Sequence, residues 1–191
     1  YCCYDLGITR YSCKIGTDPR SIGMPEASRE ALSTISQSRI HEIGTPRYLT
    51  NRVGMTGPVP RHSMFEDTGG PFFLDDHRRV DDLIEDDQSM WFETDKGLLI
   101  LLGCCHAGLV NTVEYIKAIS GIDKIHGIIG GMHLVNADEK RLQYTFDSMK
   151  SWNPDILVPC HCTGQVPVAR MIEAIGSDIV TWGCSGYTVE A

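Results

Sequence analysis

The sequence predicts an α/β fold in which helices cover a β-sheet. From Ser89 onward, segments with strand character alternate with amphipathic segments across short loops, which is typical of an α/β layer. Before about Lys96 the chain is irregular and holds six of the nine prolines, which favours turns, edge strands and loops. Regular structure is therefore expected mainly in the second half.

Three elements are expected in the first half. Apolar residues at near-helical spacing predict a helix over 26–39, and residues 48–56 hold short strands that end at Gly57-Pro58-Val59-Pro60. Seven acidic residues fall between 75 and 87, a charge pattern that favours a solvated loop.

The second half reads as a regular series. Two strands, 89–94 and 98–102, are joined by the turn 95–97, and a helix follows over 109–119. The pattern then predicts a strand at 125–129, a helix at 137–151, a strand at 156–158, a helix at 166–175 and a last strand at 179–182.

Composition narrows the class of protein. The 191 residues, 42% hydrophobic and 22% charged, suit one domain spanning 1–191 with a real core. The longest apolar run, 98–102, is far shorter than the roughly 20 residues of a bilayer-spanning helix. A net charge of −8 disfavours nucleic acid and anionic membranes as partners. We expect a small-molecule substrate, and leave a homo-oligomer open.

The ends and the cysteines add two expectations. The chain begins at Tyr1 without a signal-peptide pattern, so we expect a fragment or a processed product. Eight cysteines in a chain long enough to build its own core favour reduced thiols in a cytoplasm over a disulfide framework.

Three histidines occupy equivalent places after predicted strands. His106 lies in Gly-Cys-Cys-His-Ala-Gly, His133 in Gly-Gly-Met-His-Leu and His161 in Pro-Cys-His-Cys-Thr-Gly. They are 27 and 28 residues apart, about one strand–helix unit each. Because strand ends of such units share one sheet edge, the three imidazoles are expected to converge there as metal ligands. Imidazole suits Zn²⁺, Fe²⁺ and Mn²⁺ alike.

The remaining histidines lack this setting. They are read as structural or surface residues: His41, His62, His77 and His126.

Residues beside these histidines leave alternatives open. Thiolates could make a closed structural zinc site, or the thiols could simply pack the loops; the residues are Cys104, Cys105, Cys160 and Cys162. The single residue inside Cys160-x-Cys162 is shorter than the usual gap of about two to four residues, which favours packing. Thr163-Gly164 could bind an anion, but Thr163 as an ordinary helix N-cap is favoured.

The motifs together resemble a known family. Residues 87–89 and 96–112 are similar to the metallo-β-lactamase superfamily, and more narrowly to the branch of dihydropterin ribofuranosyl-aminobenzene phosphate synthases. Residues 129–134 and 159–164 resemble the later motifs of this branch in the right order, and 55–61 resembles an upstream segment.

The resemblance implies an αββα sandwich, two mixed sheets faced by helices, with a metal centre at one edge. His106 and His161 match metal-binding positions. His133 falls where many members place a bridging acidic ligand, so the resemblance leaves it either as a metal ligand or as a residue that contacts substrate. It further implies one or two divalent ions, zinc first and iron or manganese next, that activate water. The implied activity is a metal-dependent hydrolase acting on a small phosphorylated or pterin-like substrate.

One departure is large. The superfamily's His-x-His-x-Asp-His motif is absent, and its nearest candidate, Asp76-His77, has Phe72 and Leu74 where histidines are required. We therefore expect the chain to start downstream of that motif. Two other hypotheses follow: a non-catalytic truncated or degenerate domain that binds a ligand or partner, and a cysteine-based redox protein, which lacks a Cys-x-x-Cys pair.

Overall fold

A six-stranded mixed sheet is the larger of two sheets in the computed structural model, which describes residues 7–190. Its strand order is β3-β4-β6-β7-β8-β9, in which β3 to β7 are antiparallel and β7, β8 and β9 are parallel. The strands are β3 (Arg47–Tyr48), β4 (Val53–Met55), β6 (Ser89–Thr94), β7 (Gly97–Leu102), β8 (Ile125–Gly131) and β9 (Ile156–Cys160).

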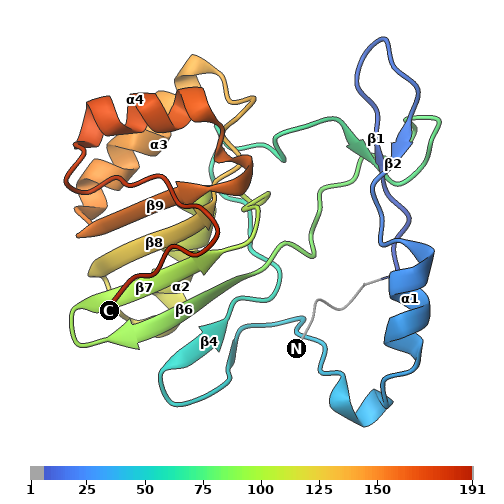
Figure 1. The fold of residues 1–191 in the computed structure, drawn as a ribbon, viewed down its shortest axis with the longest axis horizontal. Coiled ribbons are helices and arrows are strands. Elements are labelled where there is room, and N and C mark those ends of the chain that lie inside the picture. Colours follow the sequence, from blue (N-terminus) through green and yellow to red (C-terminus); the bar gives the residue numbers. More distant parts are fainter. Residues whose placement is uncertain (1–6, 191) are drawn as a thin grey trace.

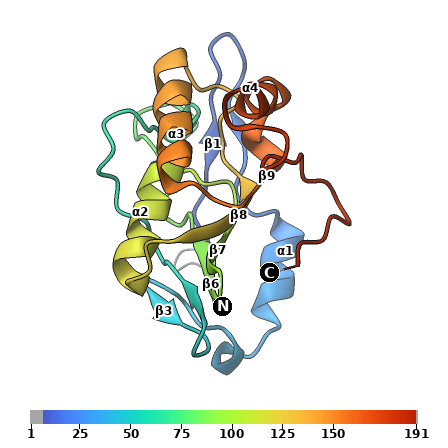
Figure 2. The ribbon, with the colours of Figure 1, turned by 90° about the vertical axis from the view of Figure 1, so that its left-hand side faces the viewer.

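Three helices belong to this sheet: α2 (Leu109–Ser120), α3 (Glu139–Trp152) and α4 (Gln165–Ile175). Helices α2 and α3 cover one face, and α4 packs beside α3 near the β9 edge (Figure 2). The core between sheet and helices contains Leu98, Ile100 and Ile128 from the strands and Val113 and Met149 from the helices, all fully buried. The α/β prediction is confirmed, and these helices and strands start and end within three residues of the predicted bounds.

The opposite face of the sheet is crossed by the C-terminal segment (Figure 1). Leu101 on this face is 40% exposed. The strand predicted at 179–182 is wrong in extent, because only Val180 pairs with β9, through Leu157. Thr181 and Gly183 still donate backbone hydrogen bonds to β9, at 2.9 Å each, so the segment follows the sheet edge without becoming a strand.

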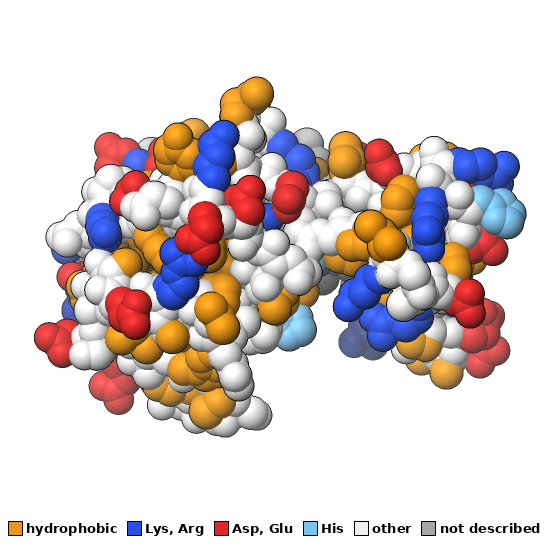
Figure 3. All heavy atoms as spheres, turned by 90° about the horizontal axis from the view of Figure 1, so that it is seen from above, with side chains coloured by type: hydrophobic (Ala, Val, Ile, Leu, Met, Phe, Trp, Pro, Cys, Tyr) orange, Lys and Arg blue, Asp and Glu red, His pale blue; other side chains and the backbone are white. Residues whose placement is uncertain are grey.

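A smaller lobe holds a three-stranded antiparallel sheet and helix α1 (Figure 1). The strands are β1 (Tyr11–Ser12), β2 (Arg20–Ser21) and β5 (Phe72–Phe73), in the order β2-β1-β5. Seen from above, a narrower waist joins this lobe to the larger one (Figure 3).

The helix predicted over 26–39 is interrupted. Helix α1 spans Glu26–Ser33, and a separate 3₁₀ turn, η1, spans Gln37–Arg39. The hydroxyls of Ser33 and Thr34 donate to carbonyls three residues back, and α1 buries none of its residues. With no core contact to extend it, the helix ends where these side chains compete for the backbone.

The acidic segment 75–87 is a loop, but the prediction that it is solvated is wrong for its second part. Asp82 is 5% exposed and pairs with Arg10 Nε at 2.7 Å, and Asp86 accepts from Arg10 Nη1 at 2.7 Å. Charge density alone does not reveal this partner, which lies more than 70 residues away in the sequence.

Among the described residues, no helix is both long and apolar enough to cross a membrane.

Candidate metal centre

The three predicted histidines meet at the carboxyl ends of β7, β8 and β9. The ring centroids of His106 and His133 are 4.2 Å apart. Nε2 of His161 lies 3.0 Å from Sγ of Cys104, and the same thiol interacts with His106 and His133. The expected convergence is therefore observed, and its centre is the sulfur of Cys104.

The loop 66–70 orients two of these rings. Nδ1 of His106 lies 2.8 Å from the carbonyl oxygen of Thr68, which, as its hydrogen-bond acceptor, fixes the tautomer and leaves Nε2 for a ligand. Gly69 lies against His133, because a Cβ at Gly69 would stand 2.0 Å from His133 Cδ2. Sequence reasoning missed this loop, since nothing local marks it as a neighbour of the histidines.

The turns carry unusual backbone angles. Three residues other than glycine have left-handed φ values: Cys105 (60°), His133 (44°) and His161 (51°). Each such residue costs of order 1 kcal/mol and persists only where its surroundings demand it. Two of the three candidate ligands are thus held in strained conformations, which is a common feature of functional sites.

The cysteines divide into two groups. Cys105 is fully buried and contacts Thr112 Oγ1 at 3.4 Å, so it packs its loop as expected. Cys104 and Cys162 instead face the histidines, and one donor atom from each lies within 4.8 Å of a ring nitrogen of His133 and of the other. For these two, the thiolate alternative is the one that the geometry favours.

Charge in the cluster is strongly coupled. The hydrogen bond from Cys162, with those from His106, His133 and His161, holds the pKa of Cys104 far below its usual value. The same thiol–thiol contact, together with burial, raises the pKa of Cys162. Burial acts against a charged His106 ring, yet its contacts with Cys104 and the Thr68 carbonyl raise its pKa.

These donors fit a divalent ion. Thiolate sulfur and imidazole nitrogen are the donors that zinc prefers. Nδ1 of His133 is buried and makes no hydrogen bond to a described residue, so no competing bond holds that nitrogen. The role of His106, His133 and His161 as metal ligands stays a prediction.

Thr163 is not the N-cap of α4 that the sequence favours. Its hydroxyl donates to the Cys160 carbonyl at 2.7 Å and accepts from the Met132 amide at 3.1 Å. The N-cap of α4 is Gly164, at φ 89°, and no side chain caps the helix. Thr163 instead ties the turn after β9 to the turn after β8.

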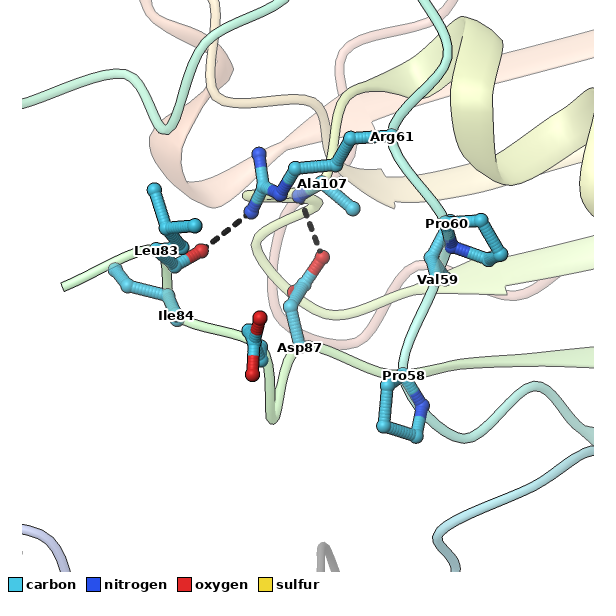
Figure 4. A pocket seen from close by; sticks show the side chains of 9 residues that line it. Pro58, Val59, Pro60, Arg61, Leu83, Ile84, Asp87 and Ala107 are labelled. Atoms are coloured by element: carbon cyan, nitrogen blue, oxygen red, sulfur yellow. Dashed lines mark hydrogen bonds between the residues drawn. The ribbon is translucent and has the colours of Figure 1, made fainter.

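A cavity of about 420 Å³ adjoins the His106 turn (Figure 4). Arg61 borders it and donates to the carbonyls of His106, at 2.7 Å, and Leu83, at 2.5 Å. Asp87 accepts from the Ala107 amide at 3.0 Å, and burial raises the pKa of its carboxyl group. Arg61 lies in the 55–61 segment that the sequence singles out. Its two carbonyl partners are 45 and 22 residues away along the chain, so only the folded structure reveals them.

Glu66 caps helix α2. Its carboxylate accepts from the amides of Val110, at 2.8 Å, and Asn111, at 2.9 Å. Gly108 provides the room, because a Cβ there would lie 2.4 Å from the carboxyl carbon. The contact anchors the loop that carries Thr68 to the element that follows His106.

The other four histidines lie outside the cluster, as predicted. His41, His62 and His77 are exposed. His126 is buried in β8 and its Nδ1 lies 2.8 Å from Asp155, a structural contact.

Comparison with solved structures identifies the fold. The crystal structure of Tm1679, a metal-dependent hydrolase of the β-lactamase superfamily, superposes with a TM-score of 0.78 at 22% identity, over 96% of this chain and 67% of that one. The chain therefore has the β-lactamase-superfamily fold, as the resemblance implied. No family model matches the chain.

Sequence relatives narrow this class. The chain is 39% identical over 97 residues to 7,8-dihydropterin-6-methyl-4-(beta-D-ribofuranosyl)-aminobenzene-5'-phosphate synthase of Methanocaldococcus jannaschii, covering 51% of this chain and 33% of that protein. It is 35% identical over 145 residues to the uncharacterized protein MJ0448 of the same organism, covering 76% and 52%. The chain is thus similar to the dihydropterin ribofuranosyl-aminobenzene phosphate synthase branch, and spans a third to a half of these relatives.

Proposed function

We propose that this chain carries the metal-binding edge of a metal-dependent hydrolase-type enzyme of the metallo-β-lactamase superfamily. The observation that supports it is the meeting of His106, His133 and His161 around one sulfur at the ends of three parallel strands. The β-lactamase-superfamily fold supports it independently.

The histidines would hold one or two divalent ions, with zinc favoured by the thiols beside them. Such an ion, when bound, supplies a coordinated water whose pKa is lowered toward neutrality. The chain's own part is orientation: the Thr68 carbonyl sets the His106 ring, and Arg61 holds the backbone of the same turn.

We propose a small, phosphorylated or pterin-like substrate. The support is the relative whose name includes a dihydropterin and a 5'-phosphate, and the cavity of about 420 Å³ beside the His106 turn, which suits a small molecule. That relative is named a synthase, so group transfer remains within the proposal alongside hydrolysis.

A non-catalytic domain that binds a ligand or partner is the second candidate. It is favoured by the absence of His-x-His-x-Asp-His from the sequence and by exposed apolar residues such as Leu101 on the face opposite α2 and α3.

Metal content tests the proposal. We expect the purified chain to bind Zn²⁺, and the His106→Ala, His161→Ala double variant to lose affinity about tenfold or more. His77→Ala, an exposed histidine outside the cluster, is the matched control and should bind as the parent does. Equal metal content in parent and double variant would exclude His106 and His161 as metal ligands.

Turnover separates the two candidates. Metal-dependent hydrolysis of a chromogenic phosphodiester, lost in the double variant and kept in His77→Ala, supports the enzyme. Tight metal binding with no turnover on phosphodiesters or phosphomonoesters supports the non-catalytic domain.

We place this activity in the cytoplasm, because eight cysteines in a chain long enough to build its own core favour reduced thiols over a disulfide framework.

A further inference from the structure

Three donor atoms at the centre of the site form a compact group of their own. They belong to Cys104, His133 and Cys162, and all lie within 4.8 Å of one another. A tetrahedral ion bound at about 2.3 Å to sulfur and 2.0 Å to nitrogen requires donors about 3.5–3.8 Å apart. The group therefore needs only small side-chain movements to close on one ion.

The backbone is arranged to bring the two sulfurs together. A Cβ at Gly131 would lie 2.8 Å from Cys162 Sγ and 3.3 Å from Cys104 Cα. The last residue of β8 therefore has to be glycine for the turns after β7 and β9 to approach each other. Cys162 Sγ also donates to the Cys104 carbonyl at 3.4 Å, which orients the second sulfur toward the first.

The third donor belongs to His133, which is half-buried and has a strained backbone. His133 has φ 44°, and its Nδ1 is buried without a hydrogen bond to a described residue. A buried nitrogen without a hydrogen bond is destabilising, and a bond from this nitrogen to an ion would offset that penalty.

We propose that Cys104, Cys162 and His133 form a thiolate–imidazole site that selects a thiophilic divalent ion such as Zn²⁺ over Mg²⁺ or Mn²⁺. The inference rests on the proposed function and deepens it, because it assigns two sulfur ligands where the histidine pattern alone predicts imidazoles. Two metal–sulfur bonds and one metal–nitrogen bond form, and each sulfur that still carries a proton releases it to solvent.

Three protein ligands leave room on the ion for water or substrate. Two cysteines and one histidine leave a fourth tetrahedral position open, as in zinc sites that bind water or substrate. His161, whose Nε2 lies 3.0 Å from Cys104 Sγ, is outside the three-donor group and stands beside it as a neighbour of the thiolate. Sulfur donors disfavour Mg²⁺ and Mn²⁺, which prefer oxygen.

Cobalt spectroscopy tests the sulfur ligands directly. Co²⁺ added to metal-free chain should give a near-ultraviolet thiolate-to-cobalt charge-transfer band that saturates at one equivalent and survives an excess of Mg²⁺. Cys104→Ser and Cys162→Ser should each lower the band by about half, and the double variant should lose it. Cys160→Ser is the matched control, because Cys160 ends β9 two residues before Cys162 but lies outside the donor group, and this variant should keep the band. A wild-type complex without the band, or a band that persists in the double variant, would overturn the inference.

A second measurement needs no substitution. Bound Zn²⁺ should protect Cys104 and Cys162 from alkylation, as mapped by mass spectrometry, and leave exposed Cys184 as reactive as before. Equal alkylation of Cys104 and Cys162 with and without Zn²⁺ would also overturn it. These results distinguish the thiolate site from the proposed function. A charge-transfer band without turnover supports the thiolate site and rejects the hydrolase. Cobalt-supported turnover without the band supports the hydrolase and rejects the thiolate site.

Discussion

Nδ1 of His106 lies 2.8 Å from the carbonyl oxygen of Thr68, 38 residues earlier in the chain. A histidine that binds metal through one nitrogen commonly donates its other N–H to a carbonyl of this kind. The loop that supplies the carbonyl is held at Glu66 by the start of α2 and at Asp67 by an ion pair with buried Arg141. The orientation of the metal edge therefore depends on a loop that contributes none of the three candidate histidine ligands.

Gly69→Ala tests this loop. The new Cβ would collide with the His133 ring at 2.0 Å and would sit at φ 82°, so we expect a loss of about 1–2 kcal/mol in the free energy of unfolding and roughly a tenfold loss of Zn²⁺ affinity. Denaturant unfolding and calorimetric titration measure the two effects.

Gly121→Ala is the control for Gly69→Ala. Gly121 has φ 71°, and a Cβ there would meet no described atom within 4 Å. It should show the stability loss alone, and equal Zn²⁺ affinities in the two variants would contradict the role given to Gly69.

Arg61→Lys should loosen the His106 turn. The guanidinium donates to the carbonyls of His106 and Leu83 at once, and one ammonium group cannot reproduce this fork. We expect a loss of about 1–2 kcal/mol in the free energy of unfolding and faster amide exchange at 104–108.

Arg52→Lys serves as its control, because that exposed pair with Asp95 should change stability by less than about 0.5 kcal/mol. Similar losses of stability in Arg61→Lys and Arg52→Lys would contradict the inference that Arg61 holds the His106 turn.

Glu66→Gln should flatten the pH dependence of stability. Burial raises the pKa of Glu66 above its ordinary value of 4.5, and the amides of Asn111 and Val110 oppose the shift only partly. Because the folded state binds this proton more tightly, the contribution is fully present below pH 4.5 and is lost as pH rises through the raised pKa.

In Glu66→Gln that decline should disappear, while one α2 amide loses its acceptor at a cost of about 1 kcal/mol. Urea unfolding between pH 4 and 7 provides the measurement, with Glu30→Gln on exposed α1 as the control. If the free energy of unfolding of the variant changes with pH as steeply as that of the parent, Glu66 does not titrate between pH 4 and 7.

Asp155→Asn removes the negative charge beside His126, a histidine outside the candidate metal centre. The hydrogen bond from His126 holds the pKa of Asp155 below its ordinary value, so its stabilising contribution is present above that value and is lost as pH falls. The variant should melt at a lower temperature near neutral pH and converge with the parent in acid. Its Zn²⁺ content should equal the parent's; a loss of metal would connect His126 to the site.

The sequence predicts the second half of the chain well because each element there has a local cause. Apolar periodicity marks the strands and helices from Ser89 onward, and the strand-end rule is enough to bring His106, His133 and His161 to one edge. Here local pattern and tertiary structure agree.

The remaining features depend on contacts that leave no local trace. Arg10 buries Asp82 from more than 70 residues away, and the Cys104–Cys162 contact spans 58 residues. The zinc-knuckle spacing rule treats Cys160 and Cys162 as one pair of ligands, whereas in the structure Cys162 contacts Cys104, after the end of β7. The sequence predicts Thr163 as the N-cap of α4, but Gly164 is the N-cap and the Thr163 hydroxyl accepts from the Met132 amide after β8.

The three parallel strands that carry the candidate donors also decide when an ion can be acquired. His106, His133 and His161 follow separate strand–helix units, 27 and 28 residues apart, so an unfolded chain presents them as distant weak chelators. Binding of an ion by these residues would therefore require the completed β7-β8-β9 pairing, and nearly all of its binding free energy would add to the stability of the assembled sheet. At 100 times the dissociation constant, this linkage amounts to about 2.7 kcal/mol. Metal supply would act on this protein as a folding partner as well as a cofactor.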